Sequence, residues 1–376
     1  MRVDLSSLGW DDGFAAAYSP FDRSDQHPAR ITRVDRGVCT ALGASGSIRA
    51  SLGGAVLHAA ASDPRTLPCA GDWVAVRYWP DDRLTVEAVL ARRTAVVRAS
   101  AGKESAGQVL AANLDAAAVV EPLEPEPDLG RVERLLALAY ACGATPLIIL
   151  TKADLLPDPG AVAASVGLVA PRVPVFAVST RTGAGMGALR PYVAPGRTLG
   201  LLGPSGAGKS SLVNAVVGAA VMGTRELRAD GRGRHTTTFR ALVPVPGGGA
   251  ILDTPGLRLV GLYSPAASGR SGAKPAVKRP HFRDTAAAGL DGAFDDIAEF
   301  AAHCRFTGCG HVSEPGCAVL EAIESGDLQP RRLANWRTLR RELAYEVRRS
   351  DYRVAKAEVA RWRRAERPAR GRRRLH

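Results

Sequence analysis

The clearest candidate for chemistry is the stretch GPSGAGKS at residues 203–210, which matches the pattern Gly-x-x-x-x-Gly-Lys-Ser. Glycines at this spacing let the backbone wrap so that its N–H groups point at phosphate oxygens. A lysine at the position of Lys209 supplies a cation to the β- and γ-phosphates, and a hydroxyl at the position of Ser210 binds Mg²⁺. The apolar run TLGLL before the loop and SSLVNAVVG after it predict the strand and the helix that such a loop needs. The stretch therefore predicts a nucleoside triphosphate site.

Two further segments indicate the base. TKAD, residues 151–154, ends a predicted strand, and Asp154 is suited to pair with the N1 and N2 donors of guanine, which adenine lacks. The stem of Lys152 can lie over the base. VST, residues 178–180, ends another predicted strand, and a backbone N–H of this stretch is suited to the guanine oxygen. The predicted GTP-binding residues are Thr151, Lys152, Ala153, Asp154, Ser179, Gly203, Pro204, Ser205, Gly206, Ala207, Gly208, Lys209, Ser210, Ser211 and Gly256.

Two segments after the phosphate loop are suited to respond to the γ-phosphate. DTPG begins at Asp253, which can hold Mg²⁺ through water, while the N–H of Gly256 can sense the γ-phosphate. GRGRHTTTFR, residues 231–240, supplies Thr237 or Thr238 as a switch residue that closes over Mg²⁺. The predicted magnesium ligands are Ser210, Thr237 and Asp253.

The residue after DTPG bears on the rate of hydrolysis. Many GTPases place a glutamine there to orient the attacking water, whereas this chain has Leu257, which can neither hydrogen-bond nor transfer a proton. We therefore expect slow hydrolysis by the isolated protein and acceleration by a partner. His235 is the candidate in this chain for orienting water; alternatively it contacts RNA or only shapes its loop. The predicted catalytic residues are His235, Lys209 and Thr237.

The order of these motifs is unusual. In ordinary GTP-binding domains the phosphate loop comes first and the base-reading motif last, but here residues 151–154 precede residues 203–210. A circular permutation explains the order, because it keeps the fold while moving the chain ends to another surface point. DTPG then becomes the last nucleotide element before the C-terminal part of the chain.

A second chemical cluster lies in CRFTGCGHVSEPGC, residues 304–317, which holds three of the six cysteines. Its spacing is C-x4-C-x-H-x5-C, and three thiolates with one imidazole make a closed tetrahedral zinc site of the structural type. Disulfides do not suit a reduced cytosol, and a catalytic cysteine would not need these companions. The predicted zinc ligands are Cys304, Cys309, His311 and Cys317.

The charge of the chain is concentrated at its end. The formal net charge is +13, and the residues from Arg331 onward hold 16 Arg and one Lys against five acidic residues. Such a block usually serves a polyanion, most often nucleic acid, although a solvated tail would have the same composition. We expect CAVLEAIESGDLQPRRLANWRTLRRELAYEV to form a helical, arginine-rich arm that the zinc site positions.

The totals describe an ordinary globular chain of 376 residues, long enough for two or three domains. No apolar run approaches a membrane span, and the start lacks the pattern of a signal peptide. The scattered Cys39, Cys69 and Cys142 suit reduced core residues. We expect a cytoplasmic protein without membrane contact, and a monomer by default.

Short apolar runs from Ala29 to about Ser100 predict the elements of the first domain. RITRVDRGVCTAL, GSIRASLG, GAVLHAAA, GDWVAVRYWP and RLTVEAVLARRTAVVRAS alternate with turn residues, which is typical of strands in a small barrel of the OB type. Trp73, Tyr78 and Trp79 are interpreted as core residues, with base stacking as the alternative.

The next part alternates strands with helices, which predicts a parallel sheet. The fold class is thus multidomain α/β: an OB-like β-barrel, a circularly permuted P-loop GTPase domain with a mostly parallel sheet covered by helices on both faces, and an α-helical zinc-binding domain. The predicted bounds are 1–28 for an N-terminal extension, 29–104 for the barrel, 105–262 for the GTPase domain, 263–289 for a disordered insertion rich in Gly, Pro and Ser, and 290–376 for the zinc domain with its basic tail.

Taken together, these motifs resemble one known family, the circularly permuted bacterial GTPases named small ribosomal subunit biogenesis GTPase A. The resemblance covers about residues 29 to 355 and depends on GDWV, ANLD, TKADL, GPSGAGKSSL, GRGRHTTT, DTPG and CRFTGCGHVSEPGCAV in that order. It implies an OB-fold, a permuted GTPase domain and a zinc domain.

The resemblance also implies a function. Members bind the immature small ribosomal subunit and its rRNA near the decoding region, assist late maturation, and hydrolyse GTP to GDP with stimulation by the subunit. The chain departs from the family at Thr151, where asparagine is commoner, in the insertion, and in its arginine-rich end. A threonine can still brace the phosphate loop.

Two other functions stay open at this point. A metabolic P-loop kinase would need an acceptor site and a lid, and neither is visible. A pure RNA-binding module would use its nucleotide only for folding. Equal affinity for ATP would favour the kinase, and turnover that is insensitive to ribosomal particles would favour the RNA-binding module.

Overall fold

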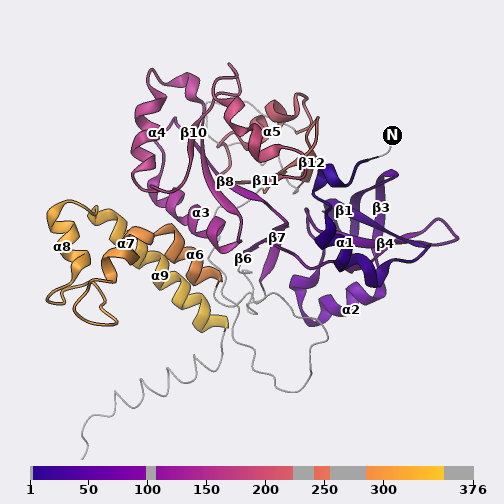
Figure 1. Cartoon of the computed structure of the whole chain (residues 1–376), viewed down its shortest axis with the longest axis horizontal. Coiled ribbons are helices and arrows are strands. Elements are labelled where there is room, and N and C mark those ends of the chain that lie inside the picture. The colour runs from indigo at the N-terminus through magenta and orange to yellow at the C-terminus, as the bar shows by residue number, and fades with distance from the viewer. Residues whose placement is uncertain (1–2, 99–106, 223–240, 255–284, 351–376) are drawn as a thin grey trace, which may run out of the picture.

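The first domain is a closed barrel, seen in the computed structural model, which describes residues 3–98, 107–222, 241–254 and 285–350 (Figure 1). Its strands pair in the order β1-β2-β3-β5-β4, and a further pairing of β1 with β4 closes the barrel. Buried and half-buried residues alternate along β2, as expected for strands with one face on a core. The strands are β1 (Gln26–Asp35), β2 (Val38–Gly43), β3 (Gly46–Leu52), β4 (Trp73–Tyr78) and β5 (Leu84–Val89).

One predicted barrel strand is a helix. The run GAVLHAAA, expected as a strand, lies in α2 (Gly54–Ser62), between β3 and β4. A short apolar run does not by itself distinguish a strand from a helix, and the alanines here favour the helix. Of this helix only Val56 is buried, so the segment covers the barrel instead of lining it.

The N-terminal segment packs on the barrel. Helix α1 (Asp12–Tyr18) begins at a cap in which the Asp11 side chain accepts the N–H of Phe14. Short 3-10 helices precede and follow it, η1 (Ser6–Leu8) and η2 (Ser19–Phe21). The buried Phe14 packs against Trp73, which is 1% exposed. The prediction that Trp73 is a core residue is therefore confirmed.

The second domain is built on a six-stranded sheet in the order β10-β9-β8-β11-β13-β12. All neighbours are parallel except β12 and β13. Every residue of the central strands β8 and β11 is buried, as expected where both faces of a parallel sheet are covered. The strands are β8 (Ala116–Pro122), β9 (Thr145–Thr151), β10 (Val175–Ala177), β11 (Thr198–Leu202), β12 (Ala241–Pro244) and β13 (Ala250–Asp253).

Helices cover both faces of this sheet. Alternate residues of β9 point to two separate cores, Ile148 to one and Ile149 to the other. The first core contains residues of α3 and α4, and the second contains residues of α5 and η5. The helices are α3 (Leu129–Ala141), η4 (Ala153–Leu155), α4 (Pro159–Gly167), η5 (Met186–Val193) and α5 (Lys209–Val217).

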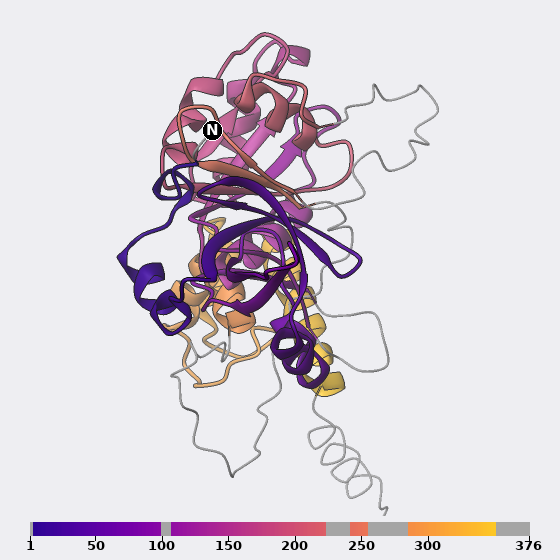
Figure 2. The ribbon, with the colours of Figure 1, turned by 90° about the vertical axis from the view of Figure 1, so that its right-hand side faces the viewer.

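The strand order shows the circular permutation. Strand β11, which leads into the phosphate loop, lies between β8, which precedes it in the chain, and β13, which follows it. Strand β9, which ends in TKAD, also precedes it. A hairpin of β6 (Ala95–Arg98) and β7 (Gln108–Ala112) joins the barrel to this domain, and β1 meets β12 at Arg33 and Ala241 (Figure 2).

The C-terminal domain is helical and lies against α3 (Figure 1). The predicted disordered insertion ends too late, because residues 285–289 belong to helix α6; residues 263–284 lie outside the described residues. The alanines of TAAAGLDGA favour this helix over a loop. The helices are α6 (Thr285–Ala293), α7 (Asp295–Ala301), α8 (Ala318–Ser325) and α9 (Pro330–Ser350).

Candidate functional site

The candidate nucleotide site lies at the carboxyl edge of the parallel sheet. The phosphate loop follows β11, TKAD follows β9, and Asp253 ends β13. The carboxyl ends of parallel strands lie at one edge, and ligands of open α/β sheets bind there. The fold thus brings together motifs that the sequence separates.

The phosphate loop folds around the side chain of Lys209. The Lys209 ammonium donates to the carbonyl oxygens of Gly203 at 2.9 Å and Pro204 at 2.8 Å. The residue is 8% exposed, and burial lowers the pKa of Lys209. Gly206 and Gly208 have φ of +84° and +86°, the left-handed region that favours glycine. A cation is therefore held beneath the start of α5, where the helix dipole also favours an anion.

Oxygen ligands suited to Mg²⁺ lie beside this loop. The Ser210 hydroxyl donates to Oδ2 of Asp253 at 3.4 Å. Asp253 is 1% exposed, its Oδ1 has no hydrogen-bond partner within the described part of the chain, and burial raises the pKa of its carboxyl. A buried carboxylate oxygen without a partner fits a site for a hard cation, which takes oxygen ligands.

Thr151 joins the base-reading segment to the phosphate loop. Its buried hydroxyl donates to the carbonyl of Ala207 at 2.7 Å. The bracing contact expected of this threonine is therefore present. The next residue, Lys152, has φ of +61°, and its ammonium donates to the carbonyl of Glu124 at 3.1 Å.

Asp154 is held by Ser179 in a way that the sequence did not indicate. The Ser179 hydroxyl donates to Oδ1 of Asp154 at 2.6 Å, and this hydrogen bond lowers the pKa of Asp154. The N–H of Ser179 donates to the carbonyl of Ala184 at 2.9 Å, so a backbone N–H for the guanine oxygen would have to come from another residue of VST. That this segment binds the base stays a prediction.

Several predicted residues lie outside the described part of the chain. They are His235, Thr237, Thr238, Gly256 and Leu257. The described start of DTPG is anchored, because the buried Thr254 hydroxyl donates to the carbonyl of Leu201 in β11. The other predicted residues of the loop, Pro204, Ser205, Ala207 and Ser211, lie between β11 and the first turn of α5.

An ion pair between a buried glutamate and a half-buried arginine was missed by the sequence analysis. Glu121 in β8 is 0% exposed, and both its oxygens accept from Nε of Arg131 at 3.1 Å. Val119 of β8 pairs with Leu202 of β11, and a Cβ at Gly203 would lie 2.3 Å from the carbonyl oxygen of Val120, so Glu121 directly follows the residue that contacts the start of the phosphate loop. A glutamate inside the apolar run AAAVVEPL was the available signal.

The cysteine cluster has the geometry of a metal site. The ligand atoms of Cys304, Cys309, His311 and Cys317 all lie within 4.8 Å of one another. Cys304 Sγ lies 3.9 Å from Cys317 Sγ and 3.6 Å from His311 Nδ1, which lies 3.4 Å from Cys317 Sγ. Tetrahedral zinc requires about 3.8 Å between sulfurs and about 3.5 Å between sulfur and nitrogen. The four residues therefore fit this ion.

The surrounding loop holds the ligands in place. The Glu314 carboxylate accepts the N–H groups of Gly310 at 2.9 Å, Val312 at 2.7 Å and Ser313 at 3.1 Å. The backbone N–H of Glu314 itself, followed by these three N–H groups, lowers the pKa of Glu314 to about 2. The carbonyl of His311 accepts from Arg337 of α9, so the loop is also tied to the arginine-rich helix.

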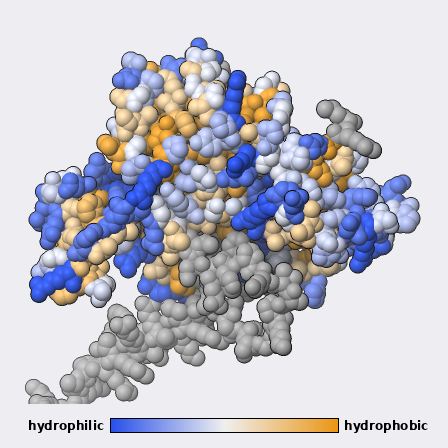
Figure 3. Space-filling model, in the orientation of Figure 1, coloured by the Kyte–Doolittle hydropathy of each residue, from blue (hydrophilic) through white to orange (hydrophobic). Residues whose placement is uncertain are grey.

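The arginines of α9 do not all face solvent. Arg331 and Arg332 pair with Glu133 of α3, so these two arginines of the predicted arm, residues 317–347, form contacts within the protein. Arg340 and Arg341 are exposed. Hydrophilic residues gather along the C-terminal domain at the left of Figure 3.

The profile of the RsgA GTPase family matches residues 89–263. Proteins named small ribosomal subunit biogenesis GTPase RsgA are similar over nearly the whole chain. The protein of Streptomyces coelicolor is 47% identical, with 94% of this chain and 90% of that protein covered. The protein of Opitutus terrae is 40% identical, with 99% of both covered.

Two solved structures share the fold. YjeQ from Thermotoga maritima has a TM-score of 0.58 at 22% identity and covers 85% of this chain and 99% of its own. YloQ, described as a circularly permuted GTPase, has a TM-score of 0.56 at 20% identity and covers 86% and 96%. Among the described helices, none has the length and apolar character needed to cross a bilayer.

Proposed function

Since the chain belongs to the RsgA GTPase family and is a GTP hydrolase, we propose that it acts on the small ribosomal subunit late in assembly. GTP hydrolysis to GDP and phosphate times its release from the subunit. The names of the relatives support the partner. The observation that carries the nucleotide site is the hydrogen bond between Thr151 and Ala207, which places TKAD beside the phosphate loop.

Each part of the site has a role in this proposal. The Asp154 carboxylate, oriented by Ser179, accepts from the N1 and N2 donors of guanine. Lys209 and the loop amides hold the β- and γ-phosphates. Ser210, Asp253 and Thr237 would hold Mg²⁺, which would supply charge stabilisation in the transition state.

Hydrolysis depends on the partner. Leu257 cannot orient water, so we assign this role to His235 in the complex with the subunit. Because catalysis of phosphoryl transfer consists mostly of positioning and charge stabilisation, correct placement of one side chain can raise the rate by large factors.

The C-terminal domain supplies the contact with rRNA. Zinc bound by the Cys304 cluster fixes the loop that contacts α9, and the exposed Arg340 and Arg341 lead into the arginines of residues 351–376. Contacts of arginines with phosphates make binding fall steeply with salt. The protein works as a monomer in the cytoplasm.

The test is GTP turnover by the zinc-loaded protein, with and without purified small subunits, and with large subunits as the control. We expect stimulation by small subunits alone, lost in Lys209→Ala. In nucleotide competition, Asp154→Asn should lose its preference for GTP over ATP. Equal affinity of the wild type for ATP, or turnover unaffected by small subunits, would refute the proposal.

A further inference from the structure

Two buried carboxylates take part in the contacts of helix α3 with its neighbours. Glu121 of β8 and Glu133 of α3 are both 0% exposed. A buried carboxylate is costly unless it is paired and hydrogen-bonded. Each of the two is paired with arginine, but the arginines come from different parts of the molecule.

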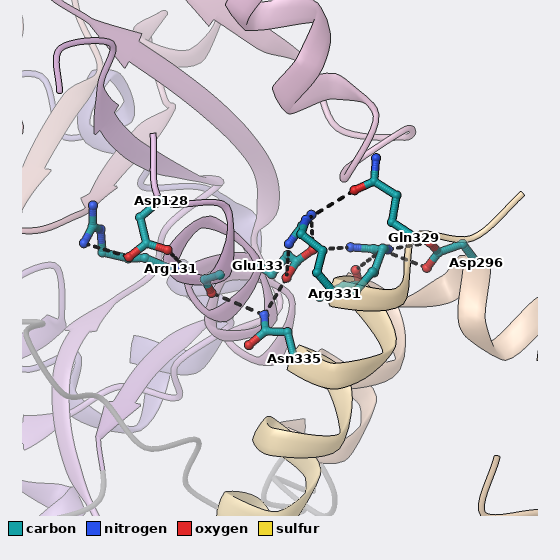
Figure 4. Close-up of polar contacts among 10 residues, drawn as sticks. Asp128, Arg131, Glu133, Asp296, Gln329, Arg331 and Asn335 are labelled. Carbon is teal, nitrogen blue, oxygen red and sulfur yellow. Dashed lines mark hydrogen bonds and ion pairs between the residues drawn. The ribbon is translucent and has the colours of Figure 1, made fainter. Parts of the chain in front are cut away.

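Glu133 attaches the C-terminal domain to α3. Its carboxylate accepts from Arg331 at 3.1 Å, Arg332 at 3.0 Å and the amide of Asn335, all from α9 (Figure 4). Arg332 is 3% exposed and also donates to Asp296 at 2.7 Å. Three donors from one helix therefore converge on a single carboxylate of another domain.

Helix α6, which belongs to the C-terminal domain like α9, also packs against α3. A Cβ at Gly289 would lie 2.4 Å from the carbonyl oxygen of Ala137, and one at Gly292 would lie 3.0 Å from the Tyr140 ring. The two helices thus meet at glycines in close contact, so a substitution at either glycine would push α6 away from α3.

The other side of α3 contacts the end of β8, beside the phosphate loop. Arg131 is two residues from Glu133, so on a helix the two side chains lie about 200° apart and face opposite ways. Arg131 donates to both oxygens of Glu121 and pairs with Asp128 at 3.2 Å. It therefore neutralises a carboxylate next to Val120, whose carbonyl oxygen would lie 2.3 Å from a Cβ at Gly203, the first residue of the phosphate loop.

We propose that helix α3 couples the C-terminal domain to the phosphate pocket, with Glu133 as the positioning residue and the Arg131–Glu121 ion pair as the element that responds. If the C-terminal domain shifts, α3 turns and Arg131 leaves Glu121. The unpaired carboxylate then repels the nucleotide phosphates, and GTP more than GDP because GTP carries more charge. By linkage, bound GTP strengthens the docking of the C-terminal domain in the same measure. This inference relies on the proposed function for the identity of the nucleotide.

A double-mutant cycle tests the coupling. Affinities of the full-length, zinc-loaded protein for fluorescent GTP and GDP analogues are measured for the wild type, Glu133→Gln, Glu121→Gln and the double variant. We expect Glu133→Gln to weaken GTP binding by about fivefold or more, the lower end of usual coupling factors, and GDP binding by less. In the Glu121→Gln background, Glu133→Gln should change the GTP affinity by less than about twofold, because residue 121 then carries no negative charge that could repel the phosphates.

A matched control lies on the same interface. Arg134 of α3 pairs with Glu342 of α9, but the Glu342 side chain is 42% exposed, so Glu342→Gln should leave both affinities unchanged. Should Glu133→Gln fail to fold, Asn335→Ala removes a single donor and takes its place in the cycle.

The outcomes separate the coupling from the function. Equal losses of GTP affinity in both backgrounds, or no loss in Glu133→Gln, would overturn the coupling only. A wild type that binds no guanine nucleotide would overturn the proposed function as well. No ribosomal particle is needed for either result.

Discussion

The hydroxyl of Thr151 donates to the carbonyl of Ala207 at 2.7 Å, joining the end of β9 to the phosphate loop 56 residues later. Both residues are buried, at 2% and 1% exposed. The contact makes the orientation of the base-reading segment depend on the loop that holds the phosphates.

The first prediction concerns this contact. Thr151→Val keeps the shape of the side chain but leaves the Ala207 carbonyl without its donor, which costs about 1–3 kcal/mol. We expect GTP affinity to fall by about tenfold, measured by equilibrium titration with a fluorescent analogue. Thr151→Asn, which restores a donor, should retain at least part of the affinity. An unchanged affinity in the valine variant would show that the hydrogen bond does not position the site.

Removal of the metal should affect the C-terminal domain and the nucleotide site differently. Chelation of zinc, or Cys309→Ser, should release the loop of residues 304–317 and abolish stimulation by small subunits, because binding free energy at a structural zinc site is folding free energy. GTP binding by the isolated protein should persist, though weakened if α3 is coupled to that domain. Zinc content by atomic spectroscopy and stimulated turnover are the measurements. Cys39→Ala, which removes a buried barrel thiol, is the control and should keep its zinc.

The N-terminal segment should be sensitive to acid at Asp11. This carboxylate caps α1 and pairs with Arg93, and the Arg93 hydrogen bond lowers the pKa of Asp11 from 3.8 to about 2. Because the pKa is lowered by folding, its contribution to stability is present above about pH 4 and is lost as the pH falls through about 2. Asp11→Asn should therefore lower Tm at pH 7, and the difference from the wild type should shrink between pH 4 and pH 2. A difference that stays constant over this range would contradict the assignment.

Two glycines in one turn provide a matched pair for stability. Gly249 has φ of +78°, and a Cβ there would lie 2.3 Å from the carbonyl oxygen of Val193. Gly247 has φ of +88°, but its Cβ would meet nothing within 4 Å. Gly247→Ala should cost about 1–2 kcal/mol for the backbone conformation alone, and Gly249→Ala clearly more. Urea denaturation gives both values, and equal losses would refute the close approach.

The sequence alone determined the chemical motifs, since their residue types and spacing are local properties. The phosphate loop required only its glycines, Lys209 and a flanking strand and helix, and the metal cluster required only four ligands within residues 304–317. Their order in the chain was enough to predict the permuted fold, which the strand order of the sheet confirms.

The tertiary structure decided what depends on partners distant in the chain. The run at 54–62 is a helix that buries only Val56, and the Ser179 hydroxyl donates to Asp154, a residue 25 positions earlier. Arg332 is an internal residue because its partners Asp296 and Glu133, 36 and 199 positions earlier, surround it in the folded chain. A sequence does not show whether a charged side chain faces water or an oppositely charged side chain, because the ion-pair partner comes from a distant part of the chain.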